Sequence, residues 1–93
     1  MTFEIAYAEA AKQDRPKLPK TAQEQIQRDI ERKLTTMPEI FGKPLRKSLK
    51  GYRRLRVGDY RIIFRIEENT VKIFKIGHRS AIYKNLILKI INS

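Results

Sequence analysis

The fold of this chain is decided by residues 52–83, which read YRRLRVGDYRIIFRIEENTVKIFKIGHRSAIY. Three runs of β-branched and aromatic residues alternate there with two short polar turns, a pattern typical of antiparallel strands joined by hairpins. Gly58-Asp59 predicts a two-residue primed turn at the tip of the first hairpin, and residues 67–70 predict the second turn. The stretch therefore predicts three consecutive strands that pair as a meander.

The first hairpin separates apolar residues from arginines. We expect Val57 to pair with Tyr60, and that register places Arg56 opposite Arg61. Because side chains alternate between the two faces of a strand, the hairpin gains two unlike faces. The apolar face carries Leu55, Val57, Tyr60, Ile62, Phe64 and Ile66, and the arginine face carries Arg54, Arg56, Arg61 and Arg65. We expect the core to cover the first face and an anion to bind the second.

The arginine face calls for a ligand because its charges repel one another. Like charges directly opposite across two strands destabilise a sheet by roughly 0.2–1 kcal/mol per pair. Arginine is also the side chain best suited to bidentate contacts with phosphate. The alternative is that the arginines lie over apolar neighbours and bond to acidic side chains. Only Asp59 is acidic between Lys43 and Arg65, which favours the ligand.

The positive charge is concentrated in one part of the chain. Residues 1–42 hold seven basic and seven acidic side chains, residues 43–65 hold nine and one, and residues 66–93 hold five and two. The whole net charge of +11 therefore lies C-terminal to Gly42. Such asymmetry indicates nucleic acid or an acidic protein as the partner. A membrane surface is less favoured, because no basic amphipathic helix is evident.

Composition narrows the class of protein further. Ninety-three residues predict a single domain spanning residues 1–93 with one modest core. The chain has no cysteine and one histidine, so we expect no disulfide, no thiolate chemistry, no metal and no cofactor. No signal peptide and no apolar run of membrane-spanning length are present. We therefore expect a cytoplasmic protein that does not enter the membrane.

Upstream of the hairpins, the sequence predicts a strand and a helix hairpin. Residues 2–7 alternate as a strand does, residues 8–15 have a helical composition, and Pro16 should end or kink that helix. A second helix should open at Leu18-Pro19, and Thr21 followed by Glu24 has the spacing of a capping box. Its apolar stripe, which needs a sheet to cover, is Ala22, Ile26, Ile30 and Leu34, extended by Met37.

The remaining segments complete an α+β fold. Residues 38–51 are expected to form a basic loop, and residues 71–76 a central strand with Val71 and Ile73 on one face and Phe74 and Ile76 on the other. Residues 80–91 predict a C-terminal helix capped by Ser80 with two apolar stripes. The expected order is N-terminal strand, helix hairpin, three-stranded antiparallel meander in one sheet, and C-terminal helix.

Two strings in this order have a specific resemblance. LKGYRRLRVGDYRIIFRI, followed by IGHRSAIY, resembles the RelE branch of the RelE/ParE toxin superfamily. The leading FEIAYAEAAK and LPK…QIQRDIERKL resemble the N-terminal strand and helix hairpin of that superfamily. The resemblance implies a toxin of a type II toxin–antitoxin system, neutralised by a cognate antitoxin. In the RelE branch the toxin is a metal-independent endoribonuclease, an mRNA interferase that cleaves mRNA in the ribosomal A site.

The resemblance also implies site residues. Its basic pair falls on Arg54 and Arg56, its third-strand arginine on Arg61, its arginine after the last strand on Arg79, and its C-terminal tyrosine on Tyr83. The other basic residues that we expect to contact RNA are Lys43, Arg46, Lys47, Lys50, Arg53 and Arg65. Three departures stand out: the best-known members carry lysines at the basic pair, the loop before Tyr83 is shorter here, and Pro16 interrupts a helix that is usually continuous.

The implied chemistry is attack of a 2′-hydroxyl on the adjacent phosphorus. Arginines can stabilise the negative charge that develops, but they stay protonated and make poor general bases. His78 is the one side chain of a type that titrates near neutral pH, and it is either the base or a packed residue at the strand end. Tyr83 either has a role in the site, stacking on a base or orienting the hydroxyl, or belongs to the core of the last helix.

Two other functions stay open. One is a ParE-like toxin that has the same fold, lacks nuclease chemistry and inhibits DNA gyrase by binding. The other is a basic nucleic-acid-binding domain without chemistry. For the leading hypothesis, the partners are mRNA on the ribosome with ribosomal RNA contacts, and an acidic cognate antitoxin that forms a hetero-oligomer with the toxin. The antitoxin should cover the basic face or the C-terminal helix.

Overall fold

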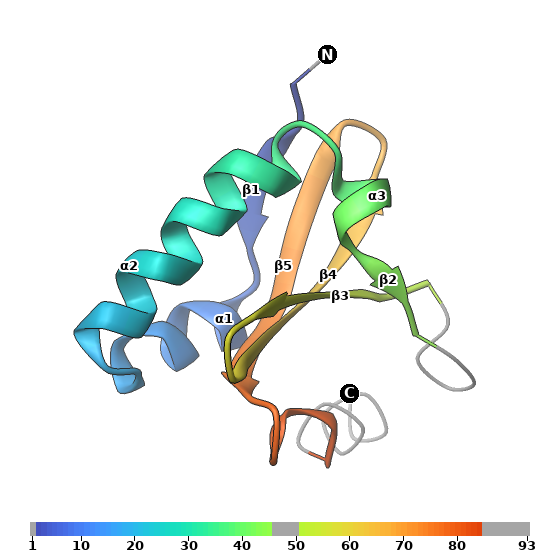
Figure 1. Ribbon diagram of the computed structural model, residues 1–93. Helices are drawn as coiled ribbons and strands as arrows, with labels where there is room; N and C mark the ends of the chain where they lie inside the picture. The colour runs from blue at the N-terminus through green and yellow to red at the C-terminus, as the bar shows by residue number, and fades with distance from the viewer. Residues whose placement is uncertain (1, 46–50, 85–93) are drawn as a thin grey trace.

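A computed structural model describes residues 2–45 and 51–84, which form helices and one mixed sheet (Figure 1). The α+β class is confirmed. The elements in chain order are β1 (Glu4–Tyr7), α1 (Glu9–Asp14), the 3₁₀ turn η1 (Arg15–Lys17), α2 (Lys20–Asp29), the π-helical turn η2 (Ile30–Leu34), α3 (Pro38–Phe41), β2 (Lys43–Pro44), β3 (Arg53–Val57), β4 (Tyr60–Glu67) and β5 (Thr70–His78).

The sheet contains the predicted meander and two further strands. Its order is β1-β5-β4-β3-β2, with β1 parallel to β5 and the other pairs antiparallel. The predicted register is confirmed, because Val57 pairs with Tyr60 and Arg56 with Arg61. The backbone φ angle is positive at Gly58 (59°), as the first position of a type II′ turn requires. The second turn connects Glu67 of β4 to Thr70 of β5, and these two residues pair with each other as expected.

Residues 38–51 were expected to form a loop. That expectation is wrong for residues 38–44, where α3 and β2 lie. Pro38 opens α3, where its missing N–H and fixed φ suit the first turn of a helix. Pro44 lies in β2, the last strand of the sheet, where a residue without an N–H is tolerated. β2 pairs Lys43 with Arg54, so it extends the arginine-bearing hairpin by one strand.

The helix hairpin is confirmed, with two corrections in α2 and the turn after it. Pro16 lies in η1, where α1 has ended. α2 has Pro19 at its N-cap without a side-chain cap, so the expected capping box at Thr21 does not form. Ile26, Ile30 and Leu34 of the stripe are buried and Ala22 is half-buried, but Met37 is 51% exposed. The π-helical turn η2 changes the angular spacing of the stripe, and the chain leaves the helix before Met37.

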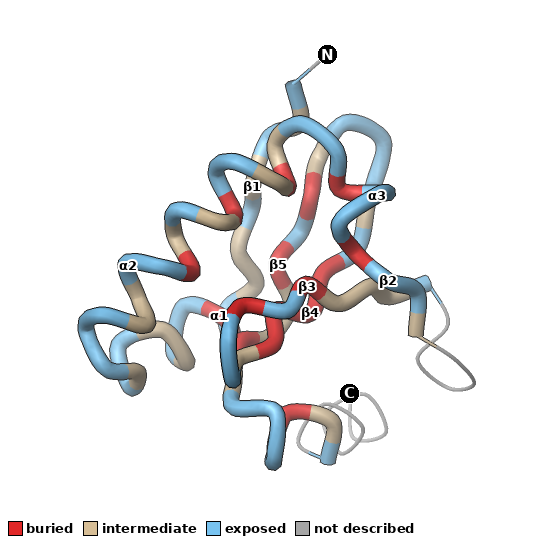
Figure 2. The backbone as a smooth tube through the Cα atoms, in the orientation of Figure 1, coloured by how far each residue is buried: buried red, intermediate tan, exposed pale blue. Residues whose placement is uncertain are grey.

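Apolar side chains pack on both faces of the sheet, and Figure 2 shows buried positions along α2 and along β3, β4 and β5. The main core joins α2 and η2 to the expected apolar face of the hairpin. Its buried members are Ala11, Ile26, Ile30, Leu34, Leu55, Val57, Ile62, Phe64, Val71, Ile73 and Ile76. A second cluster holds buried Ile63 and Ile82, with Leu45, Tyr52, Phe74 and Tyr83 packed against them. The arginine face therefore also carries a small apolar cluster.

A bulge in β5 explains how its residues divide between the two clusters. Ile63 pairs with Lys75, whereas the next residue of β4, Phe64, pairs with Ile73. Phe74 is the extra residue and packs in the second cluster, while Ile76 belongs to the main core. The expectation that Phe74 and Ile76 share a face is therefore wrong, because a bulge breaks strict alternation.

The edge of β5 is completed by a side chain. β1 pairs with β5 only as far as Ile73, so the next part of that edge lacks a neighbouring strand. Asp14, at the end of α1, accepts hydrogen bonds from the Ile76 backbone N–H (3.2 Å) and from Lys75 Nζ (2.9 Å). The carboxylate thereby satisfies a backbone donor that would otherwise lack a partner.

The chain passes from β5 into the segment that covers the second cluster. A Cβ atom on Gly77 would lie 2.9 Å from Ile82 Cδ1, so glycine lets the isoleucine pack onto the sheet. Residues 82–84 are helical. The rest of the predicted C-terminal helix, with most of its two apolar stripes, lies outside the described residues.

Truncation of the main core tests the face assignment. Ile62 is completely buried, so Ile62→Ala should lower the free energy of unfolding by about 2–5 kcal/mol. Ile40 is 72% exposed on α3, and Ile40→Ala is the matched control. Urea denaturation of both variants measures the difference. An unchanged midpoint for Ile62→Ala would show that the faces of the hairpin are assigned the wrong way round.

Candidate functional site

The arginine face of the hairpin is hollowed by a small cavity of about 150 Å³. This basic cavity is lined by Phe41, Lys43, Arg54, Arg56 and Arg61. The lining comes from α3, β2, β3 and β4. Four of its five side chains are cationic, and within residues 2–45 and 51–84 no carboxylate forms an ion pair with them. The cavity is therefore suited to an anion.

Strand pairing brings these cations together. Lys43 lies opposite Arg54, and Arg56 lies opposite Arg61. Side chains that stand opposite one another share a face of the sheet. The cavity therefore follows from the register of three strands, of which β2 was missed by the sequence analysis.

Arg61 is the most buried of the four cations that line the cavity, and hydrogen bonds to the backbone hold its side chain. Its side chain is nearly buried, at 9% exposed. Arg61 Nη1 donates to the carbonyl oxygens of Gly58 (3.0 Å) and Tyr60 (2.9 Å). These bonds fix the guanidinium against the hairpin turn, and its planar fork has five N–H donors in all. Arg56, by contrast, is exposed, so the opposed pair combines a fixed charge with an accessible one.

Arg54 connects the basic cavity to the C-terminal segment. Arg54 Nη1 donates to the Tyr83 hydroxyl oxygen at 3.0 Å. The Tyr83 ring packs in the second cluster. Both hypotheses for Tyr83 thus have support: the ring is packed, and the hydroxyl reaches an arginine that lines the cavity.

His78 and Arg79 lie outside the basic cavity. The His78 ring meets the Tyr60 ring edge-on, with centroids 5.8 Å apart, and Tyr60 packs against the main core. His78 is therefore on the face opposite the arginines. Its Nδ1 accepts the Ser80 backbone N–H at 3.1 Å, which leaves the neutral ring's proton on Nε2. Arg79 follows β5 directly, and its Nε lies 3.7 Å from Oδ1 of Asp59 at the exposed hairpin tip.

The expected RNA contacts have different positions. Lys43 lines the cavity. Arg53 is used within the fold, because its Nη1 donates to the carbonyl oxygen of Gly42 (3.0 Å) and reaches that of Glu39 (3.4 Å). Arg65 is exposed, with its guanidinium carbon 5.2 Å from the centroid of the Tyr52 ring. Arg46, Lys47 and Lys50 lie outside the described residues.

Comparison with known proteins shows the family of the chain. The family model described as "ParE toxin of type II toxin-antitoxin system, parDE" matches residues 5–83. The chain belongs to this family of toxins. It is 34% identical to Toxin RelG of Mycobacterium tuberculosis over 90% of this chain and 99% of that protein. It is 32% identical to Toxin RelE of the same organism, over 88% of this chain and 87% of that protein.

A solved structure supports the same conclusion for the fold of this toxin. The crystal structure of the toxin–antitoxin complex RelBE2 from Mycobacterium tuberculosis superposes with a TM-score of 0.81 at 30% identity. The match covers 86% of this chain and 94% of that chain. The chain is thus a toxin of a type II toxin–antitoxin system with a RelE-like fold.

One residue of the toxin's cavity, Phe41, was missed by the sequence analysis. It lies at the end of α3, just before the basic segment, and is 41% exposed. The sequence did contain a signal for it. Phe41 is an aromatic residue outside the apolar stripe of the second helix, and it stands shortly before the basic segment that begins at Lys43. Aromatic side chains beside basic ones are typical of surfaces that bind single-stranded nucleic acid.

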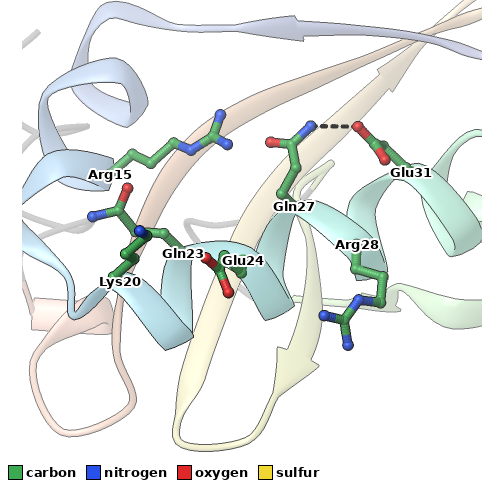
Figure 3. A pocket seen from close by; sticks show the side chains of 7 residues that line it. All are labelled: Arg15, Lys20, Gln23, Glu24, Gln27, Arg28 and Glu31. Carbon is green, nitrogen blue, oxygen red and sulfur yellow. Dashed lines mark hydrogen bonds between the residues drawn. The ribbon is translucent and has the colours of Figure 1, made fainter.

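A larger groove of about 410 Å³ runs along α2 of the toxin (Figure 3). Its lining is Arg15, Lys20, Gln23, Glu24, Gln27, Arg28 and Glu31. Cations and carboxylates are mixed there, and Gln27 Nε2 donates to Glu31 Oε1 at 2.7 Å. Nearby, burial raises the pKa of Tyr7, an effect partly offset by Arg15. With charges of both signs, the groove has less selectivity for an anion than the basic cavity.

Within residues 2–45 and 51–84, no group of three or more His, Cys, Asp or Glu side chains is placed to hold a metal ion. Over the same residues no helix is both long and apolar enough to cross a membrane.

The bond between Arg54 and Tyr83 can be measured by a double-mutant cycle. Tyr83→Phe removes the acceptor, so it should lower the free energy of unfolding by about 0.5–1.5 kcal/mol. In an Arg54→Ala background the same change should cost much less, because the donor is already absent. Tyr52→Phe, in the same cluster, is the control. Equal costs of Tyr83→Phe in both backgrounds would contradict the hydrogen bond.

Proposed function

We propose that this toxin is a ribosome-dependent endoribonuclease that cleaves mRNA in the A site. The observation that carries the proposal is the basic cavity, in which Arg54, Arg56 and Arg61 converge and to which the described part of the chain contributes no carboxylate. Relatives named Toxin RelE and Toxin RelG add support. The substrate's 2′-hydroxyl loses its proton and attacks the adjacent phosphorus, and the bond to the 5′-oxygen breaks as that oxygen takes up a proton, which leaves a 2′,3′-cyclic phosphate and a 5′-hydroxyl. No metal is needed for this reaction.

The cavity's arginines supply charge stabilisation. Attack on the phosphodiester places additional negative charge on the phosphoryl oxygens, and donors that are already oriented stabilise it without reorganising. Arg61 is held in place by two backbone carbonyls. The exposed Arg56 opposite it is positioned to contact the phosphate from the solvent side. The phosphate in turn removes the repulsion between the two guanidinium groups.

Proton transfer is the step for which the cavity is least equipped. Its arginines stay protonated and cannot serve as a general base. His78 packs against Tyr60 on the other face of the sheet, and this position favours the packing role over the catalytic one. We therefore propose that the ribosome contributes part of the proton transfer. Cleavage of free RNA by the isolated toxin is then slow.

A cognate antitoxin is the second partner that we propose. The RelBE2 structure is that of a toxin–antitoxin complex. The cations of the basic cavity favour an acidic antitoxin segment, which would exclude RNA by occupying the same charges. Because the proposed substrate is mRNA on the ribosome, we expect the toxin to act in the cytoplasm.

The competing function is inhibition of DNA gyrase, and the ParE name of the matching family favours it. A translating extract to which purified toxin is added separates the two. Cleavage of mRNA at codon boundaries supports the nuclease. Intact mRNA, together with DNA damage markers in cells that express the toxin, supports the gyrase inhibitor and overturns our proposal.

Removal of one exposed arginine should impair catalysis without unfolding the toxin. Arg56→Ala is expected to lower the rate of mRNA cleavage by about 100- to 1000-fold. Arg32→Ala is the matched control, because Arg32 is an exposed arginine of η2 outside the cavity. Rates are measured by primer extension in the translating extract, and folding by circular dichroism. Cleavage by Arg56→Ala at the control's rate would contradict the assignment.

Salt dependence tests whether phosphates bind in the basic cavity. Each neutralised phosphate of a single strand contributes a slope of about −0.7 in the logarithm of affinity against the logarithm of salt concentration. With three arginines engaged, the toxin should bind single-stranded RNA with a slope of roughly −2 or steeper. Arg56→Ala should reduce the steepness by about 0.7, and Arg32→Ala should not. A flat response of the unmodified toxin would show that RNA binds elsewhere.

A further inference from the structure

We propose that Phe41 forms a base-stacking subsite beside the phosphate-binding arginines. In this assignment the ring stacks on the nucleobase adjoining the phosphate that occupies the basic cavity. The proposal rests on the proposed function for its substrate class, single-stranded RNA. It adds a residue that selects a nucleotide over a bare phosphate.

Phe41 is available for this role because, within residues 2–45 and 51–84, its ring stays partly open to solvent. It is 41% exposed, and neither apolar cluster includes it. Its neighbours Met37 and Ile40 are also exposed, at 51% and 72%. Of these three, Phe41 alone lines the basic cavity. The aromatic ring and the guanidinium groups therefore border one and the same space.

The backbone around Phe41 is fixed by several contacts. The next residue, Gly42, packs so tightly on Phe64 that a Cβ atom there would overlap the ring. Arg53 donates to the carbonyl oxygen of Gly42, and the Phe41 N–H donates to the Met37 carbonyl at 3.1 Å. An aromatic ring on a fixed backbone loses little entropy when a ligand stacks on it.

The chemistry of the lining points to a nucleotide. The four cations of the lining favour an anionic ligand. The aromatic ring beside them favours a flat apolar group that is joined to that anion. A nucleotide combines both, since every base has a π-face that an aromatic side chain can cover. Lys33 Nζ lies over the Phe41 ring, 5.5 Å from its centroid, and adds a cation next to the proposed stack. Arginine pairs with carboxylate as well as with phosphate, so the feature that favours RNA over an acidic peptide is the exposed ring beside the cations, which a nucleobase can cover.

The test compares two short RNA probes that carry the same phosphates. One is a trinucleotide blocked against cleavage by 2′-O-methyl groups, and the other is the same oligomer without its bases. Affinities for the isolated toxin are measured by calorimetry. Phe41→Leu, which keeps an apolar side chain but lacks the π-face, should weaken binding of the complete trinucleotide by roughly 5- to 150-fold. It should leave the affinity for the abasic probe unchanged.

Three further variants make the result specific. Phe41→Trp should retain or improve affinity for the complete trinucleotide, because it keeps an aromatic face. Ile40→Ala, a change at a more exposed neighbour outside the cavity, should alter neither affinity. Arg56→Ala should weaken binding of both probes, because it removes a phosphate contact. Thermal unfolding shows whether each variant keeps its fold.

Several outcomes would overturn the subsite. These are equal affinity of Phe41→Leu and the unmodified toxin for the complete trinucleotide, equal losses for both probes, and no binding of either probe by the unmodified toxin. An unchanged affinity would assign the exposed residues of α3 to a protein partner instead. The readout does not depend on cleavage. A base-dependent loss in Phe41→Leu, combined with intact mRNA in the translating extract, would uphold the subsite and reject the nuclease.

Discussion

The opposition of Arg56 and Arg61 across the first hairpin is the constraint on which the rest of the site depends. Pairing two cations costs stability, yet the register that creates the pair is the one that buries Leu55 and Ile62 in the main core. A slip by one residue would remove the repulsion but would turn every apolar side chain of the strand to the wrong face. The fold therefore retains the repulsion because the core requires it.

Local patterns predicted the parts of the structure that depend on neighbouring residues. The hairpin register followed from the chemistry of the Gly58 turn and from strict alternation, and three cavity arginines followed from that register. Each of these features is set within a span of about ten residues. The same holds for the break at Pro16, because proline acts on its own turn.

The features that were missed depend on distant contacts. β2 is two residues long, and its pairing with β3 across a connecting segment gives no periodic signal. The bulge at Phe74 lies where β5 pairs with β4. It reverses the face of the sheet on which the later side chains of β5 lie, including that of His78. Phe41 enters the cavity because Gly42 fits against Phe64, more than twenty positions further along the chain.

The parallel pairing of β1 with β5 has a consequence for the order in which the chain can assemble. Glu4 pairs with Thr70 and Tyr7 with Ile73, so the first strand of the chain finds its only partner in the last described one. During synthesis β1 is made early and then stays unpaired until β5 has emerged. Closing so long a loop is slow compared with forming a local hairpin. A translation product interrupted before β5 would therefore hold the arginine hairpin without a finished sheet beside it, which ties completion of the proposed RNA-binding cavity to synthesis as far as His78.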